Sequence, residues 1–333
     1  MAAVTDTIGT TGRDFSTITL WEASLSAHSG DDVTGECYND SAFDEKPTIN
    51  DATPTSVALT VASGERHDGT EGTGARILLT SSGTSNLITF DIAATCDWLE
   101  IDANGQNPNW IVDANVAGGI MRKLIAHGTS SSGSIQAVVG GNSGDSKTLN
   151  CIVYDVTCTG AGSESNLGLN CQAGVSLNNT VHGMINNNGT GICTCINYRE
   201  NLPSDYRNNI GVAAGGTSSG TVIDWRDSGG AGVSHDYNAS SDATAPDNGN
   251  SLLSITTADQ FVSTVGGSED LHLKAGADCI GAGVDIGTSP SGVEIDIDGR
   301  DRDAEGDTWD IGADQFVAEA SGFPFERYYS WGA

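Results

Sequence analysis

The densest group of residues that could do chemistry lies toward the C-terminal end of the 333-residue chain. The acidic run that begins at Asp296 partly resembles a calcium-binding loop. The twelfth position of such a loop holds a bidentate glutamate, but counting from Asp296 that position is Asp307. Arg300 and Arg302 interrupt the acidic run, so an ion-paired hairpin is the alternative to a Ca²⁺ site. The calcium interpretation assigns four carboxylates around a glycine turn as ligands: Asp296, Asp298, Asp301 and Asp303.

Carboxylates on strand-like segments could instead catalyse glycoside hydrolysis, which uses two of them about 5 to 9.5 Å apart. The chain holds 44 acidic residues, so such pairs also arise without any function. We therefore assign no catalytic residue from them. The candidate positions lie within or just after β-rich runs: Asp97, Asp102, Asp155, Asp224 and Asp227.

The segment Arg66-His67-Asp68 offers another route to acid–base chemistry, because a carboxylate can orient a neighbouring imidazole. Adjacent residues of a strand point to opposite faces, so His67 and Asp68 need not touch. The simpler interpretation is a structural turn. In it, Arg66 pairs with a nearby carboxylate and His67 packs into the N-terminal part of the fold.

The charge of the chain excludes several classes of function. Forty-four acidic residues against 14 basic ones give a net charge of −30, which repels phosphate backbones and excludes a general nucleic-acid binder. No apolar run approaches the ~20 residues of a membrane span, and the first residues lack the features of a secretory signal. Molar salt would screen the self-repulsion. The composition thus favours a halophile's protein, with an acidic marine or extracellular protein as the alternative.

Short β-rich runs alternate with Gly-, Ser- and Asn-rich turns from about residue 75 to 230. A drifting period in the twenties is typical of a parallel β-solenoid, whose turns bury apolar residues only when stacked. A β-sandwich is the alternative, but its strands recur every 8 to 12 residues. The apolar anchors, separated by 24, 27, 25, 19 and 27 residues, are Ile101, Ile125, Ile152, Leu177, Ile196 and Ile223.

The two ends differ from this middle part. Residues 15–25 predict a short amphipathic helix with Ser16 or Thr17 as N-cap, and with Ile18, Trp21 and Leu25 on one stripe. Such a helix would cap the first turn of a solenoid. We divide the chain into an N-terminal cap with the first turns (1–75), the solenoid core (76–250), a closing segment (251–320) and an aromatic tail (321–333).

The tail is rich in aromatic residues in a chain that is only 6% aromatic. Aromatic residues of this kind anchor protein interfaces, so the tail is either a partner-binding anchor or a strap folded over the last turn. The anchor residues would be Phe323, Phe325, Tyr328, Tyr329 and Trp331.

The eight cysteines show no C-x-x-C motif, and most stand among apolar or β-branched neighbours. Free cysteine is among the residue types that are most often buried. We therefore predict thiols in the core.

Motifs in the N-terminal and C-terminal parts of the chain resemble those of a known group of proteins. The first are Gly12-Arg13-Asp14-Phe15, Gly35-Glu36-Cys37-Tyr38 and Gly64-Glu65-Arg66-His67-Asp68-Gly69. The later ones are Asp270-Leu271-His272-Leu273, Ala277-Asp278-Cys279-Ile280-Gly281-Ala282-Gly283, Asp296-Ile297-Asp298-Gly299 and Asp310-Ile311-Gly312-Ala313. These resemble the opening and the C-terminal closure of right-handed parallel β-helix proteins, which are often found in tailed viruses and marine microbes. The closure departs from the usual pattern at Arg300-Asp301-Arg302 and at Asp314-Gln315-Phe316.

The resemblance implies an all-β, right-handed parallel β-helix, and it constrains activity little because this fold hosts enzymes, adhesins and virion parts. We expect a non-enzymatic structural protein of a tailed virus with a halophilic host: a capsid decoration, a vertex turret or a tail-associated protein. It would form a homo-oligomer, bind other virion proteins and contact host-surface glycans or an S-layer. It would be assembled in the host cytoplasm and need no cofactor other than Ca²⁺. The alternative is a carbohydrate-active β-helix enzyme or a tailspike that binds or cleaves polysaccharide, and a cellular adhesin is a third class.

Overall fold

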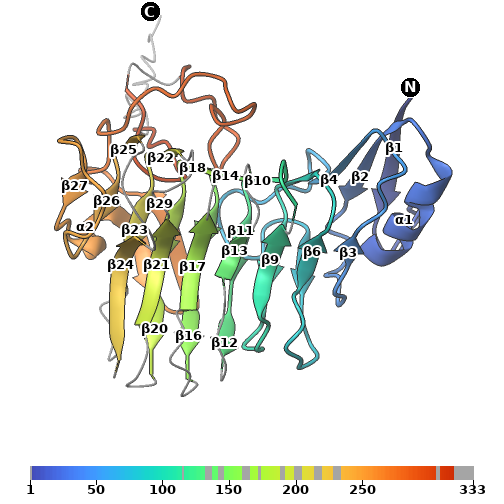
Figure 1. Ribbon diagram of the computed structural model, residues 1–333, viewed down its shortest axis with the longest axis horizontal. Coiled ribbons are helices and arrows are strands. Elements are labelled where there is room, and N and C mark those ends of the chain that lie inside the picture. The colour runs from blue at the N-terminus through green and yellow to red at the C-terminus, as the bar shows by residue number, and fades with distance from the viewer. Residues whose placement is uncertain are drawn as a thin grey trace, which may run out of the picture.

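The protein is a parallel β-solenoid of about seven turns, as the sequence repeat predicts (Figure 1). The computed structural model describes residues 2–114, 116–131, 137–141, 146–159, 166–171, 174–187, 192–198, 205–213, 220–227, 234–304 and 308–318. The turns stack along the long axis of the molecule, from the N-terminal helix at one end to α2 (Thr257–Gln260) at the other (Figure 1). No helix in these ranges is long and apolar enough to cross a membrane.

Three long parallel sheets form the walls of the solenoid. The nine-stranded sheet contains β1 (Ala3–Ile8), β2 (Asp32–Cys37), β4 (Ser56–Val61), β7 (Ala94–Asp97), β10 (Ile120–Arg122), β14 (Lys147–Leu149), β18 (Val175–Leu177), β22 (Asp205–Arg207) and β25 (Ser234–Asp236). The eight-stranded sheet contains β5 (Arg76–Leu78), β8 (Glu100–Asp102), β11 (Ile125–His127), β15 (Ile152–Val153), β19 (Thr180–His182), β23 (Ile210–Val212), β26 (Ala239–Ser240) and β27 (Leu252–Leu253). The seven-stranded sheet contains β3 (Thr48–Ile49), β6 (Ile88–Phe90), β9 (Trp110–Ala114), β13 (Ala137–Gly141), β17 (Asn166–Cys171), β21 (Ile192–Tyr198) and β24 (Thr221–Asp227).

Two smaller sheets complete the fold. A three-stranded parallel sheet contains β12 (Thr129–Ser131), β16 (Val156–Cys158) and β20 (Met184–Asn186). An antiparallel hairpin in the closing segment pairs β28 (Phe261–Val265) with β29 (Ser268–Leu273).

The predicted helical cap is present at the N-terminal end. Helix α1 spans Ile18–Ser24 and continues into a 3₁₀ turn, η1 (Leu25–Ala27). The hydroxyl of Thr17 accepts a hydrogen bond from the Leu20 N–H at 3.1 Å, which satisfies one of the free donors at a helix start. The predicted stripe of Ile18, Trp21 and Leu25 is fully buried, and the helix contacts β1, β2 and β3.

A row of left-handed residues marks the corner between the nine-stranded and the eight-stranded sheet. The row contains Trp98, Lys123, Asn150, Asn178, Asn208 and Tyr237, with φ between 50° and 65°. The spacings along this row, from 98 to 123, 150, 178, 208 and 237, are 25, 27, 28, 30 and 29 residues. Asparagine tolerates this conformation better than other non-glycine residues.

The 19-residue step predicted within the repeat is wrong. Ile152 lies in the eight-stranded sheet, Leu177 in the nine-stranded sheet and Ile196 in the seven-stranded sheet. The residues in register with Ile152 on the next two turns are Thr180 and Ile210. Strands of the three sheets are equally apolar and look alike in sequence. The spacing from Ile152 to Leu177 to Ile196 therefore compares residues of different sheets.

Side chains of the eight-stranded sheet build two separate apolar layers. Ile101, Ala126 and Val153 belong to the main core inside the solenoid. Ile125 and Ile152 alternate with them and belong to a second cluster, which includes Phe261, Leu271, Ile297 and Ile311. The second layer therefore joins the outer face of this sheet to the closing segment. The seven cysteines whose side chains are described are all buried, which confirms the prediction of core thiols for those positions.

The closing segment folds back along the solenoid and contacts the corner row. The amide Nδ2 of Asn150 donates to the carbonyls of Gly292 and Val293, both at 3.2 Å, and Asn178 Nδ2 donates to Val293 at 3.0 Å. Asn208 continues this pattern on the next turn, donating to the Val284 carbonyl at 2.8 Å. In Figure 1 the orange-to-red chain lies beside β14, β18 and β22. The aromatic tail predicted as an anchor (Phe323, Phe325, Tyr328, Tyr329 and Trp331) lies outside the described residues.

Candidate functional site

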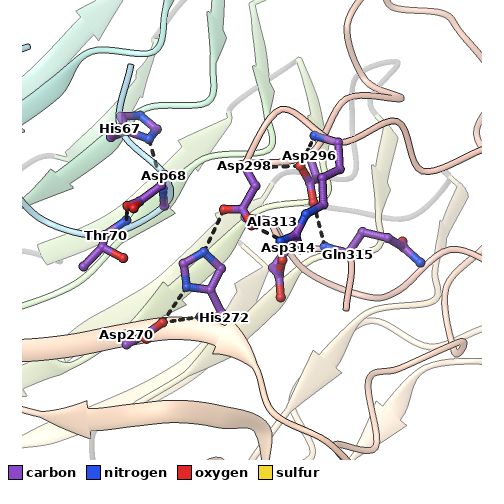
Figure 2. A network of polar contacts seen from close by, with 12 residues as sticks. His67, Asp68, Thr70, Asp270, His272, Asp296, Asp298, Ala313, Asp314 and Gln315 are labelled. Atoms are coloured by element: carbon purple, nitrogen blue, oxygen red, sulfur yellow. Dashed lines mark hydrogen bonds and ion pairs between the residues drawn. The ribbon is translucent and has the colours of Figure 1, made fainter. Parts of the chain in front are cut away.

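An open pocket of about 380 Å³ lies where the closing segment meets the loop formed by residues 64–74. Asp68 and Thr70 line it from that loop. The hairpin strand β29 and the turns that follow it supply the other polar side chains: Asp270, His272, Asp298, Arg300 and Asp314. Figure 2 shows His272 between Asp270 and Asp298, with Asp314 beside them. Three chain segments thus bring a histidine and three carboxylates together.

His272 is held by two carboxylates. Its Nδ1 lies 2.5 Å from Asp270 Oδ1, and its Nε2 lies 2.8 Å from Asp298 Oδ1 (Figure 2). Asp270 and His272 are two residues apart on β29, so their side chains leave the strand on the same face. Burial lowers the pKa of His272, but the hydrogen bond and charge of Asp298, the charge of Asp314 and the hydrogen bond to Asp270 outweigh burial and raise it to about 10.

Asp296 fixes the turn that carries Asp298. Its Oδ1 accepts the backbone N–H groups of Asp298 at 3.0 Å and Arg300 at 2.7 Å, and its Oδ2 accepts the Gln315 N–H at 3.2 Å. Burial raises the pKa of Asp296, and the charge of Arg302 partly offsets this. The turn therefore presents the Asp298 carboxylate to His272 and to Arg300, whose Nη1 lies 3.2 Å from Asp298 Oδ2.

Asp314 is the most buried carboxylate of the pocket, with 3% of its surface exposed. Its Oδ2 accepts the Leu273 N–H at 2.7 Å. Its Oδ1 is buried and has no hydrogen-bond partner among the residues that the structure describes. Burial raises the pKa of Asp314 to about 6, although the charge of His272 and the Leu273 N–H act to lower it.

The four aspartates predicted as calcium ligands do not converge on one point. Asp296 binds backbone N–H groups, and Asp301 accepts the Asp303 N–H at 3.0 Å. Asp303 accepts the indole N–H of Trp309 at 2.9 Å. Of the four, only Asp298 belongs to a described group of potential ligands whose atoms lie within 4.8 Å of one another. A calcium site at these residues stays a prediction.

The segment Arg66-His67-Asp68 lies in an irregular part of the 64–74 loop, where its contacts are structural and it forms no turn. The Nε2 of buried His67 lies 2.8 Å from the Lys123 carbonyl, and its Nδ1 lies 3.3 Å from the Gly69 N–H. A carbonyl can only accept, so Nε2 carries the proton and Nδ1 accepts. Burial lowers the pKa of His67 to about 4. The guanidinium of Arg66 lies over the Trp98 ring, 4.9 Å from its centroid, and donates to the Val61 carbonyl in place of the expected carboxylate pairing.

Two of the five carboxylates considered for glycoside hydrolysis, Asp97 and Asp224, hold the fold together. Asp97 is ion-paired with Arg122. Asp224 is buried and accepts the N–H groups of Ala213 at 2.6 Å and Ser241 at 2.6 Å. Burial raises the pKa of Asp224 above its usual value, and these hydrogen bonds offset only part of the rise. Such carboxylates serve as acceptors for turns, which is a structural role.

A second cluster around a histidine joins two neighbouring strands of the eight-stranded sheet, β8 and β11, to the 64–74 loop. Glu71, Asp102 and His127 place potential ligand atoms within 4.8 Å of one another. The His127 ring stacks on Tyr154 with centroids 4.8 Å apart, and the Tyr154 hydroxyl donates to Glu71 at 3.2 Å. Nε2 of His127 also lies 3.2 Å from fully buried Glu100. The polar atoms of this second cluster therefore largely bind one another and neighbouring protein side chains.

His272, Asp270 and Asp314 are the site residues that sequence reasoning missed. The one local signal was the Asp-x-His spacing of 270 and 272, which places both side chains on one face of a strand. Comparisons of the chain with protein-family models, with curated proteins and with solved structures found no match. The site must therefore be interpreted from its own geometry.

Proposed function

We propose that the protein is a structural component of a tailed virus particle with a halophilic host, acting as a rigid scaffold within the virion. The observation that supports a scaffold role best is the closing segment, which covers the outer face of the eight-stranded sheet through a second apolar layer. Buried Arg302 donates to the carbonyls of Gly312 and Ala313 within this segment, and it joins the segment to the solenoid by a hydrogen bond to the side chain of Asn150. A solenoid sealed in this way offers long, stiff walls for contacts with copies of itself and with other particle proteins.

The engagement of the strand carboxylates also supports the scaffold role. Asp97 and Asp224 bind an arginine and backbone N–H groups, respectively, so neither is free to act on a substrate. The setting in a virion depends on the resemblance of the terminal motifs, and the halophilic host depends on the charge of −30. Binding to host-surface glycans or an S-layer belongs to the same proposal.

The direct test is a mass-spectrometric inventory of purified virus particles from the source of the sequence. The proposal expects this chain at a stoichiometry typical of a structural protein, and its absence from intact particles would overturn it. A second test compares incorporation of the full chain with that of a chain ending at residue 320. If residues 321–333 are the anchor, the shortened chain should fold but fail to enter particles. Normal incorporation would contradict the anchor role.

One observation favours a polysaccharide-active enzyme as a second candidate. The open pocket holds several carboxylates, and Asp314, whose pKa burial raises to about 6, could donate a proton near neutral pH. The test is the release of reducing ends or unsaturated products from a panel of acidic and neutral polysaccharides. The enzyme candidate expects release by the parent chain and its loss in Asp314→Asn. Equal background release by both would contradict it.

A further inference from the structure

We propose that His272, Asp298 and Asp314 form a binding site for a divalent transition-metal ion of the Zn²⁺ class. Each offers one ligand atom, and these atoms lie within 4.8 Å of one another. A tetrahedral ion with bonds of about 2.0–2.2 Å separates its ligand atoms by about 3.3–3.6 Å. The three side chains are therefore close to the spacing that such an ion requires, and they come from β29 and two later turns of the closing segment.

The buried oxygen of Asp314 is the independent observation that points to a ligand. Asp314 Oδ1 is shielded from solvent and has no hydrogen-bond partner among the described residues, while Oδ2 accepts the Leu273 N–H. Buried polar atoms in folded proteins almost always have a partner. A cation beside His272 and Asp298 would supply the missing partner.

The surroundings of His272 match those of a metal-bound histidine. A ligating imidazole usually donates its other N–H to a carboxylate, which fixes the ring and the tautomer. Here Asp270 occupies that position at Nδ1, at 2.5 Å, and leaves Nε2 directed at Asp298. Asp270 is therefore a positioning residue, and Asp296 plays the same part for the turn that bears Asp298.

Gly69 brings the backbone of the 64–74 loop against the same two ligand atoms. Its φ is +85°, and a Cβ at this position would lie 2.3 Å from His272 Nε2 and 2.9 Å from Asp298 Oδ1. Any larger residue would collide with the proposed ligands. The loop thus bounds the site on one side, while the pocket lined by Asp298, Arg300 and Asp314 leaves it open on another.

The ligand set favours zinc over calcium. Zn²⁺ accepts one imidazole and two carboxylates with a water at an open fourth position, as in catalytic sites. Ca²⁺ prefers six to eight oxygen ligands, and a histidine nitrogen is a poor substitute. Four carboxylates line the pocket, those of Asp68, Asp270, Asp298 and Asp314, against the two basic side chains of His272 and Arg300. A doubly charged ion therefore also lowers the repulsion among the carboxylates.

The test uses the full chain, freed of metal with a chelator and titrated with ZnCl₂ in a calorimeter. The expected result is one Zn²⁺ per chain. Affinity should fall at least tenfold in His272→Gln and in Asp314→Asn, which keeps an oxygen for the Leu273 N–H. Asp301→Asn is the matched control, because it makes the same charge change at an exposed residue in the same segment and should bind as the parent does. Asp270→Asn should cost about 10- to 100-fold, the usual effect of losing such a partner.

A measurement on the unaltered chain guards against variants that fail to fold. Co²⁺ should bind with a visible absorption typical of nitrogen and oxygen ligands, and Zn²⁺ should displace it. No saturable binding of either ion would overturn the proposal, as would equal losses in Asp301→Asn and Asp314→Asn. A thiolate-to-cobalt charge-transfer band would assign the ion to cysteines and overturn it as well. The scaffold proposal does not depend on this result, because particle incorporation is measured separately.

Discussion

The side-chain amide of Asn179 donates to Oδ1 of Asn209 on the next turn of the solenoid at 2.9 Å. Asn209 in turn donates to Oδ1 of Asn238 at 3.2 Å, and all three residues are fully buried. Each follows a left-handed corner residue, Asn178 in the case of Asn179. This ladder links three successive turns by side-chain hydrogen bonds inside the core, where an unmade bond is costly.

Replacing Asn209 with alanine should therefore destabilise the solenoid. Its Oδ1 accepts the Asn179 N–H at 3.0 Å, and its Nδ2 donates to the Ser176 carbonyl at 2.8 Å. Several buried groups would lose partners, at a cost of about 3 kcal/mol in the free energy of unfolding. Urea denaturation measures the change. Asn39→Ala, at an exposed turn, should cost less than about 0.5 kcal/mol, and equal midpoints for the two variants would contradict the prediction.

The stacked architecture could be predicted because its signals are local. Apolar and β-branched residues recur in short runs such as residues 151–154, and the N-cap of α1 is visible at Thr17. The length of a turn was harder to predict, since Leu177 and Ile196 occupy different walls yet have similar neighbours. Left-handed corner residues such as Asn150 and Asn178 occupy the same corner on successive turns. Their spacing is therefore the better marker of the period.

The pocket could not be predicted because its geometry is not local. Asp298 stood out within the acidic run, but its partner His272 is 26 residues earlier in the chain. Asp314 lies beside His272 and Asp298 only because the closing segment folds back, so that its carboxylate accepts the Leu273 N–H. Proximity in sequence was misleading here, since Asp301 and Asp303 are close to Asp298 in the chain and hold other turns.

Arg302 should be essential for holding the closing segment together and for its contact with Asn150 on the solenoid. It is fully buried and donates to the carbonyls of Gly312 at 2.9 Å and Ala313 at 2.8 Å, and to the side chain of Asn150 at 3.2 Å. Arg302→Ala leaves these buried acceptors without their donor, at a cost of about 3 kcal/mol in the free energy of unfolding. Hydrogen exchange should show lost protection in residues 276–304 before the strands of the solenoid are affected. Arg300→Ala, two residues away and partly exposed, should leave protection unchanged, and similar exchange in the two variants would contradict the role of Arg302.

The charge of −30 predicts that salt stabilises the folded chain. At low ionic strength the carboxylates repel one another, and screening at molar salt shortens the range of this repulsion to about 3 Å. The melting temperature should therefore rise between 0.1 and 2 M KCl, most steeply at the low end. Sucrose at matched osmolality stabilises by exclusion from the surface and serves as the control. An equal rise in sucrose, or no rise in KCl, would argue against the electrostatic explanation.

The buried cysteines should not react while the protein is folded. Burial raises the pKa of Cys151 to about 12, although a nearby N–H and the charge of Lys123 oppose this, and Cys37 shows a rise of the same direction and main cause. The thiolate is the reactive form, so both access and ionisation oppose modification. Ellman's reagent should leave the seven described cysteines unmodified in buffer and modify them in guanidinium. Peptide mapping identifies the positions, and rapid labelling of Cys151 in the native chain would refute the prediction.

His182 should make the protein less stable at mildly acidic pH. His182 is buried and packs against Phe261 in a T-shaped arrangement, with ring centroids 6.0 Å apart. Burial lowers the pKa of His182 to about 4. In the unfolded chain the pKa is about 6.5, so the unfolded state binds more protons between these values. The contribution of neutral His182 is complete above about pH 6.5 and is lost as the pH falls toward 4.

His182→Leu should remove this part of the pH dependence, because leucine suits the same apolar layer. Between pH 7 and pH 4.5 the parent chain should lose about 2 kcal/mol more than the variant. Urea denaturation at several pH values measures the difference. His28→Leu is the control, since His28 is partly exposed beyond η1, and it should follow the parent curve. If His182→Leu follows the parent curve as well, the acid sensitivity of the protein originates elsewhere, and buried His67, whose pKa is lowered to about 4 in the same way, is the next residue to replace.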